Sequence, residues 1–210
     1  MSDTQRSLRV DATLLVCLLR DFDDASITVV DDAGAVASWA RVGDLASPLD
    51  HLQHDAGEGP CLDALRDGRL VLAPRIRHDG RWPAYVAAGV GIGLRSQLAM
   101  PVRWRDDMLL GALNLYSTTH DDIDASAPVV AGVVAGQVGR SLASFREIEA
   151  LDRALAERTV IGQACGLVMG RLDLDPDHAF EHLRRRAAAQ GRALVLVAQE
   201  MVLTSDPRPG

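Results

Sequence analysis

No proline and no cluster of turn-forming residues interrupts residues 129–170 of this chain. Apolar side chains recur through this segment at steps of three or four residues, which is the spacing of one face of an α-helix. They are Val130, Val134, Val138, Leu142, Phe145, Ile148, Leu151 and Leu155. The pattern predicts one long helix that leaves a first folded unit and runs into a second. The apolar seam also predicts dimerisation, the alternative being a helix that packs only on its own sheet.

Three glycines, Gly132, Gly136 and Gly139, lie within the predicted helix. Each of them lowers helix propensity by about 1 kcal/mol relative to alanine. We interpret them as packing sites, because a residue without a Cβ atom allows another backbone to approach closely.

The charge of the chain limits how it can bind nucleic acid. The formal net charge is −7, and all 22 basic residues are arginine. Residues 1–145 hold 13 arginines against 19 acids, and residues 146–210 hold 9 against 10. Any contact with nucleic acid must therefore come from local arginine clusters and not from a generally basic chain.

Composition also indicates the compartment and the class of protein. No apolar run approaches eighteen residues, and the first residues lack the pattern of a signal peptide, so we expect a cytoplasmic protein without a membrane span. The three cysteines, Cys17, Cys61 and Cys165, are far apart, which favours a reducing compartment. No metal-binding cysteine or histidine cluster and no P-loop, serine-hydrolase or zinc-protease motif is present. We therefore expect neither a metal site nor an enzyme.

Residues 8–118 predict an α+β fold. A helix over 8–20 precedes two strands, 25–34 and 35–42, that meet at the turn residues Asp31 to Gly34. A loop over 43–60, a helix over 62–68 ended by Gly68 and a strand over 69–74 follow, then an irregular segment with a short helix over 75–93. Strands over 95–104 and 108–118 close the series through a hairpin turn at 105–107. This order describes an antiparallel sheet with flanking helices.

Several segments of this region resemble the GAF domain, a small-molecule sensor fold related to PAS. They are Gly57-Glu58-Gly59-Pro60-Cys61, Arg81-Trp82-Pro83, Ser96-Gln97-Leu98-Ala99, Pro101 and Gly111-Ala112-Leu113-Asn114-Leu115-Tyr116. They are similar to the GAF domains that precede ANTAR modules in actinobacterial regulators. The resemblance implies a sensor domain over residues 8–145.

A GAF domain of this kind implies a small-ligand pocket between the sheet and its covering loops. The resemblance places eight residues in its lining: Trp39, Gln53, Cys61, Trp82, Tyr85, Leu98, Met100 and Asn114. A pocket filled by its own side chains is the alternative, and neither the ligand nor any cofactor is identified. His51, His54 and His78 are candidate haem ligands, but we interpret them as surface residues. Cys61 is either a redox-sensitive thiol near a helix start or a small buried side chain.

Residues 155–202 resemble the ANTAR domain, a three-helix module that binds hairpins in nascent RNA and prevents transcription termination. The matching positions are Arg158, Val160-Ile161, Gln163-Ala164, Gly166, Met169, Ala179-Phe180, Leu183-Arg184-Arg185 and Val197-Ala198. The resemblance implies an all-α domain over 146–203, followed by a disordered tail over 204–210. Asp175 is expected to cap its second helix, with Pro176 in the first turn. Phe180, Leu183 and Ala187 are expected to form the inner face of that helix.

The two resemblances together imply a signal-responsive antitermination regulator, controlled by its sensor domain. They assign RNA binding to Arg158, Gln163, Arg184, Arg185 and Arg192, which would contact stem-loops in transcripts as RNA polymerase makes them. Cys165 stands where the ANTAR pattern usually has lysine. The alternative is a ligand or redox sensor and dimerisation protein whose degenerate ANTAR module does not bind RNA. The charge around Arg184 and Arg192 distinguishes the two hypotheses.

Overall fold

The computed structural model describes residues 3–105 and 108–204. The chain divides into two compact units, and the boundary lies between Phe145 and Arg146. One helix of 46 residues, α5 (Ala127–Leu172), belongs to both units, which confirms the long helix predicted from its uninterrupted apolar period.

The first unit is built on a five-stranded antiparallel sheet in the order β2-β1-β5-β4-β3. The strands are β1 (Asp24–Val30), β2 (Val36–Val42), β3 (Val71–Ala73), β4 (Ser96–Trp104) and β5 (Met108–Ser117). The turn between β1 and β2 forms as predicted, because Asp31 Oδ1 accepts hydrogen bonds from the N–H groups of Ala33 and Ala35 at 2.9 and 2.8 Å. The turn predicted at 105–107 includes residues 106–107, which lie outside the described residues.

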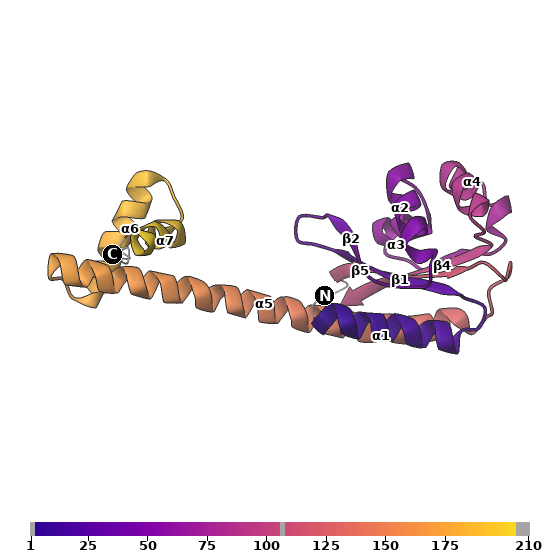
Figure 1. Ribbon diagram of the computed structural model, residues 1–210, viewed down its shortest axis with the longest axis horizontal. Coiled ribbons are helices and arrows are strands. Elements are labelled where there is room, and N and C mark those ends of the chain that lie inside the picture. The colour runs from indigo at the N-terminus through magenta and orange to yellow at the C-terminus, as the bar shows by residue number, and fades with distance from the viewer. Residues whose placement is uncertain (1–2, 106–107, 205–210) are drawn as a thin grey trace, which may run out of the picture. The chain divides into compact units, whose positions relative to one another are not determined.

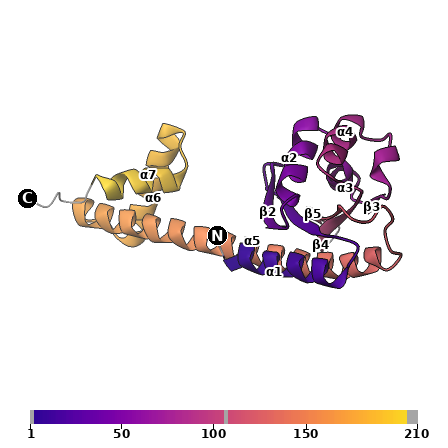
Figure 2. The ribbon, with the colours of Figure 1, turned by 45° about the vertical axis from the view of Figure 1, so that its right-hand side comes forward.

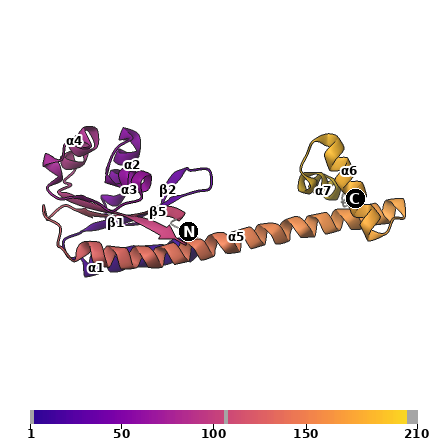
Figure 3. The ribbon, with the colours of Figure 1, turned by 180° about the vertical axis from the view of Figure 1, so that it is seen from behind.

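Helices cover both faces of this sheet, as Figures 1, 2 and 3 show. One face packs on α1 (Asp3–Leu18) and on the first part of α5, through a core that includes Leu15, Ile27 and Leu142. The other face is covered by α2 (Ala46–Ala56), α3 (Pro60–Asp67), the 3-10 turn η1 (Ile76–His78) and α4 (Pro83–Gly91). This architecture confirms the predicted α+β class and its antiparallel sheet with flanking helices.

The segment 43–60 was predicted to be a loop, and that prediction is wrong for α2. Its Asp, His and Pro residues are typical of loops, but Ala46, Leu49 and Gln53 recur at steps of three and four and are all buried. Tertiary burial of this narrow stripe therefore stabilises a helix that composition alone did not indicate. Helix α2 also forms one wall of a pocket between the helices and the sheet.

Only one of the three glycines predicted as packing sites is in fact held by a close backbone approach. A Cβ atom on Gly139 would lie 2.2 Å from the carbonyl oxygen of Arg103 in β4, so α5 touches the sheet backbone there. At Gly132 the nearest atom would be the Met100 methyl group at 3.7 Å, and at Gly136 only the end of Arg140 comes within 4.0 Å.

The predicted apolar seam of α5 divides into two parts. Val138 and Leu142 are buried against the sheet, as expected for a helix that packs on its own sheet. Ile148, Leu151 and Leu155 instead remain 57–65% exposed. The apolar residues of α5 that lie within the first unit thus pack into its core. Those that follow the first unit form an apolar stripe without a partner among the described residues.

The second unit is all-α, as predicted. The end of α5 packs with α6 (Pro176–Gln190) and α7 (Leu194–Leu203) around a small core that includes Ala164, Leu183 and Ala198. Asp175 caps α6 by accepting a hydrogen bond from the N–H of His178 at 2.9 Å, which confirms the predicted cap.

The inner face of α6 differs from the prediction at one residue. Leu183 and Ala187 are buried, but Phe180 is 43% exposed and Ala179 takes the inner position. The helix is rotated so that a small side chain, and not the aromatic ring, faces the other two helices. Of the predicted tail, residues 205–210 lie outside the described residues.

Candidate functional site

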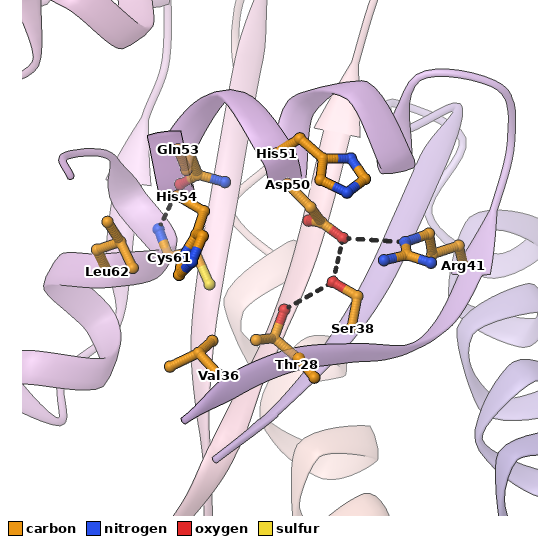
Figure 4. A pocket seen from close by; sticks show the side chains of 11 residues that line it. Thr28, Val36, Ser38, Arg41, Asp50, His51, Gln53, His54, Cys61 and Leu62 are labelled. Atoms are coloured by element: carbon orange, nitrogen blue, oxygen red, sulfur yellow. Dashed lines mark hydrogen bonds and ion pairs between the residues drawn. The ribbon is translucent and has the colours of Figure 1, made fainter. Parts of the chain in front are cut away.

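A cavity of about 290 Å³ lies between the sheet and the helices α2 and α3. Figure 4 shows its lining, in which β1 and β2 face α2 and the start of α3. The lining residues are Thr28, Val36, Ala37, Ser38, Arg41, Asp50, His51, Gln53, His54, Cys61 and Leu62. The cavity is therefore mixed, with apolar walls and several convergent polar groups, as ligand pockets usually are.

Asp50 on α2 is the centre of a hydrogen-bond network in this pocket. Its Oδ1 accepts from Ser26 Oγ at 2.7 Å and from the Tyr116 hydroxyl at 2.5 Å. Its Oδ2 accepts from Ser38 Oγ at 2.5 Å and lies 3.5 Å from Arg41 Nε, as drawn in Figure 4. Burial, reinforced by the negative charge of Asp50, raises the pKa of the Tyr116 hydroxyl well above its usual value. The hydroxyl thus stays a hydrogen-bond donor.

A second network fixes Gln53 beside the first. The Gln53 amide oxygen accepts from the backbone N–H of Cys61 at 2.8 Å and from Gln97 Nε2 at 3.3 Å. Its amide nitrogen donates to the Tyr116 hydroxyl at 3.2 Å, and Tyr85 donates to Gln97 Oε1 at 2.6 Å. The base of the pocket is rigid as a result, since each of these buried groups already has a partner.

Cys61 lines the pocket, but its thiol does not have the lowered pKa that a redox-sensitive cysteine requires. Burial raises the pKa of its thiol to about 12, although Asn114 Nδ2 donates to the sulfur at 3.3 Å. A helix start was expected to lower this pKa, but the loss of hydration outweighs it. Cys61 is therefore a small buried side chain, which was the other interpretation.

The structure brings together only some of the eight residues predicted to line a pocket. Gln53 and Cys61 line it, and Asn114 lies next to it through its contact with Cys61. Trp82 and Tyr85 are buried in the core beneath α4 and lie outside the lining.

Three of the predicted lining residues lie on the wrong face of the sheet. Trp39, Leu98 and Met100 pack in the core against α1 and α5. The reason is the alternation of strand side chains: Gln97 faces the pocket side, so Leu98 must face away from it. Trp39 is the extra residue of a β-bulge in β2. Thr28 of β1 pairs with Ser38 and its neighbour Ile27 pairs with Ala40, so Trp39 between them is passed over in the pairing.

Sequence reasoning missed Ser38, Arg41 and Asp50, the most polar part of the lining. Asp50 was overlooked because its segment was interpreted as a loop. The spacing of Asp50, Gln53 and His54 on one helical face is the signal that could have found it.

His51 and His54 lie at the exposed rim of the pocket. His51 Nδ1 lies 2.8 Å from the carbonyl oxygen of Ser47, one turn earlier on α2. Across the parts of the chain that the structure describes, no three His, Cys, Asp or Glu side chains are grouped to hold a metal ion.

The residues predicted to bind RNA lie on the exposed surface of the second unit. Arg184 and Arg185 both pair with Glu181, at 2.8 and 3.2 Å, and Arg192 pairs with Glu200 at 2.5 Å. The Arg184 and Arg185 side chains nevertheless stay 67% and 78% exposed. Hydrogen bonds from both arginines hold the pKa of Glu181 below its usual value, so Glu181 is ionised at neutral pH.

Arg158 and Gln163 are exposed on α5. Arg158 makes no ion pair with the residues that the structure describes, so its full charge faces solvent. Cys165, at the usual lysine position, is partly buried against the three-helix core, and burial raises the pKa of its thiol. The surface is thus positive at Arg158 and partly neutralised along α6.

Comparison with known proteins agrees with this division into two units. A family model for the GAF domain matches residues 12–143, and one for the ANTAR domain matches residues 149–202. A search of curated proteins gives no match. No described helix is long and apolar enough to cross a bilayer.

Several solved structures are similar to the chain. The GAF domain of an Acinetobacter phosphoenolpyruvate-protein phosphotransferase has 16% identity and a TM-score of 0.55, over 70% of this chain and 86% of that one. The GAF domain of the cyanobacteriochrome TePixJ has 18% identity and a TM-score of 0.55, over 70% and 92%. A type II free methionine-R-sulfoxide reductase from Thermoplasma acidophilum has 15% identity and a TM-score of 0.53, over 68% and 94%. Identities this low show a shared fold and nothing more.

Proposed function

Because the chain belongs to the GAF domain family and continues into an ANTAR domain, we propose that it is a signal-responsive transcription antitermination regulator. The GAF unit senses a small molecule, and the ANTAR unit binds hairpins in nascent RNA, close to the transcribing polymerase. The protein acts in the cytoplasm without catalysing a reaction. A sensor unit joined to an RNA-binding output unit is what the two family matches support.

The observation that carries the RNA-binding proposal is the exposure of the arginines on the ANTAR unit. Arg158 is unpaired among the described residues, and Arg184 and Arg185 keep most of their surface in water. Exposed ion pairs are weak and are screened by salt, so an RNA phosphate can displace Glu181. A guanidinium then offers two parallel donors to the phosphate and a planar face to an unpaired base.

Crosslinking followed by RNA sequencing tests the proposal directly. The wild-type chain should enrich transcripts that contain paired hairpins, and the Arg158/Arg184/Arg185→Ala triple variant should not. The matched control is Arg20/Arg69/Arg77→Ala, which removes the same charge from exposed positions of the GAF unit. The proposal fails when the first triple variant recovers the same hairpins as the wild type.

A second candidate function is a sensor and dimerisation protein whose ANTAR unit does not bind RNA. The pairing of Arg184 and Arg185 with Glu181, and of Arg192 with Glu200, favours it. A Glu181→Gln variant separates the candidates, because it removes one negative charge without changing the size of the side chain. An RNA-binding unit should gain affinity several-fold at low salt and lose the gain at high salt, whereas the second candidate gains nothing.

We also propose that the chain forms a homodimer through α5. Ile148, Leu151 and Leu155 follow one another at steps of three and four residues and form one exposed face of the helix. Three large aliphatic side chains on a single helical face are characteristic of a coiled-coil contact. An identical helix from a second copy would bury them against one another.

The route from the pocket to α5 runs through β2. Ser38 faces Asp50 in the pocket, and the bulged Trp39 beside it points the opposite way. Trp39 meets the ring of Phe145 on α5 edge to face, with 5.6 Å between centroids. A ligand that favours one position of β2 would thus favour one position of the helix, provided that its affinity for the two states differs.

A further inference from the structure

We propose that the GAF pocket takes a small organic anion, whose carboxylate is held by Arg41. This inference rests on the proposed sensor function and names the chemical class of its ligand. It is carried by the count of hydrogen-bond donors and acceptors around the pocket.

Asp50 is the only carboxylate among the described residues of the lining, and it already has hydrogen-bond partners. Asp50 accepts hydrogen bonds from Ser26, Ser38 and Tyr116, which occupy both of its oxygens. A cationic ligand would have to displace these short hydrogen bonds and would also face the charge of Arg41. Asp50 therefore organises the pocket and is not available as a receptor for an amine.

Arg41 is in the opposite situation. Its Nε is buried and forms an ion pair with Asp50 Oδ2 at 3.5 Å, but it has no hydrogen-bond acceptor among the described residues. A guanidinium carries five N–H donors in a planar fork. In Figure 4 the Arg41 side chain extends from β2 toward Asp50 at one end of the pocket. Unused donors of a partly buried guanidinium are a receptor for a carboxylate, whose two oxygens match the fork.

The rest of the lining sets the size and the body of the ligand. Val36 and Leu62 supply apolar wall opposite the polar end, and His51 and His54 add imidazoles at the rim. A cavity of about 290 Å³ lies at the small end of the range for ligand sites. A branched or aromatic monocarboxylate suits such a volume.

Ligand-observed NMR on the full chain tests this inference with matched probe sets. Each set holds an aromatic or branched carboxylate, its primary amide, the amine of the same shape and the phosphate ester of the corresponding alcohol. We expect the carboxylates to show saturation transfer and the amines to show none. Carboxylate affinity should fall by about ten- to a hundredfold in Arg41→Gln, as expected for the loss of a charge-assisted pair. Arg77→Gln, on the exposed turn η1, is the matched control and should leave it unchanged.

Arg41→Lys guards against a folding defect, because it keeps the charge and removes the planar fork. It should bind carboxylates more weakly than the wild type but better than Arg41→Gln. The inference is overturned if amines or amides bind as well as carboxylates, if phosphate esters bind better, if no probe binds, or if Arg41→Gln binds like the wild type. Because RNA crosslinking is measured on the ANTAR unit, these failures leave the antitermination proposal standing and are distinguishable from its own failure.

Discussion

Replacing Gly139 by alanine should leave the GAF unit less stable than the same change at Gly136, which should stabilise it. Both residues lie in one turn of α5, so both substitutions gain the same helix propensity, about 1 kcal/mol. They differ in what the new methyl group meets. At Gly139 it would lie 2.2 Å from the carbonyl oxygen of Arg103, and at Gly136 it meets only the flexible end of Arg140 at 4.0 Å.

The cost at Gly139 follows from this overlap. Real Cβ atoms essentially never come within 3.0 Å of another heavy atom, so α5 must move away from β4 by close to 1 Å. The neighbouring Val138 and Leu142 are fully packed on the sheet and lose contacts when the helix moves. Overpacking of this kind costs about 1–3 kcal/mol, which exceeds or cancels the propensity gain. We expect Gly139→Ala to be less stable than Gly136→Ala by about 1–3 kcal/mol.

Urea unfolding followed by tryptophan fluorescence measures this difference. The three tryptophans, Trp39, Trp82 and Trp104, all lie in the first unit, so their signal reports on the GAF unit and not on the ANTAR unit. Far-ultraviolet circular dichroism would check that both variants keep their helix content. Equal midpoints for the two variants, or a higher midpoint for Gly139→Ala, would refute the close contact between α5 and β4.

With a thiol pKa of about 12, roughly one Cys61 in ten thousand is ionised at pH 8. Iodoacetamide should therefore alkylate the exposed Cys17 at least a hundredfold faster than Cys61, as followed by mass spectrometry. Partial burial tends to raise the pKa of Asp23, but hydrogen bonds from Thr118 and Thr119 lower it further, and the net shift is downward. Its stabilisation is therefore complete above the unfolded pKa near 3.8 and is lost as the pH falls through the lower folded pKa. In urea titrations, Asp23→Asn should cost about 1 kcal/mol at pH 7 and progressively less as the pH falls below 3.8. Leu151→Glu should weaken self-association at least tenfold in analytical ultracentrifugation, whereas Ala150→Glu, outside the apolar stripe on another face of α5, should not. Equal effects would contradict a contact through the apolar stripe.

The elements that the sequence predicted well are those governed by neighbours along the chain. The long helix α5, the turn at Asp31, the end of α3 at Gly68 and the cap at Asp175 all depend on residues within one or two turns. Apolar periods of two and of three to four residues distinguished strands from helices over most of the first unit. The two domain resemblances then gave the fold of each unit.

The pocket was predicted less well because its lining depends on which way each side chain points. A strand reverses the facing of its side chains at every residue, and a single bulge shifts this alternation for the rest of the strand. Leu98 and Met100 were therefore assigned to the wrong face, and the bulge at Trp39 could not be inferred from β2 alone. Asp50 was missed for the related reason that α2 is held in place by burial and not by composition.

By itself, the sequence determined the order of helices and strands and the division into a sensor unit and a helical output unit, because these follow from local periodicity, caps and recognisable segments. Only the tertiary structure decided that Gly139, and not Gly136, touches a strand, and that Asp50 accepts three hydrogen bonds while Arg41 Nε has no hydrogen-bond partner among the described residues. Such facts depend on distances between residues far apart in the chain. Those distances are set when the helices pack on the sheet, and no local pattern encodes them.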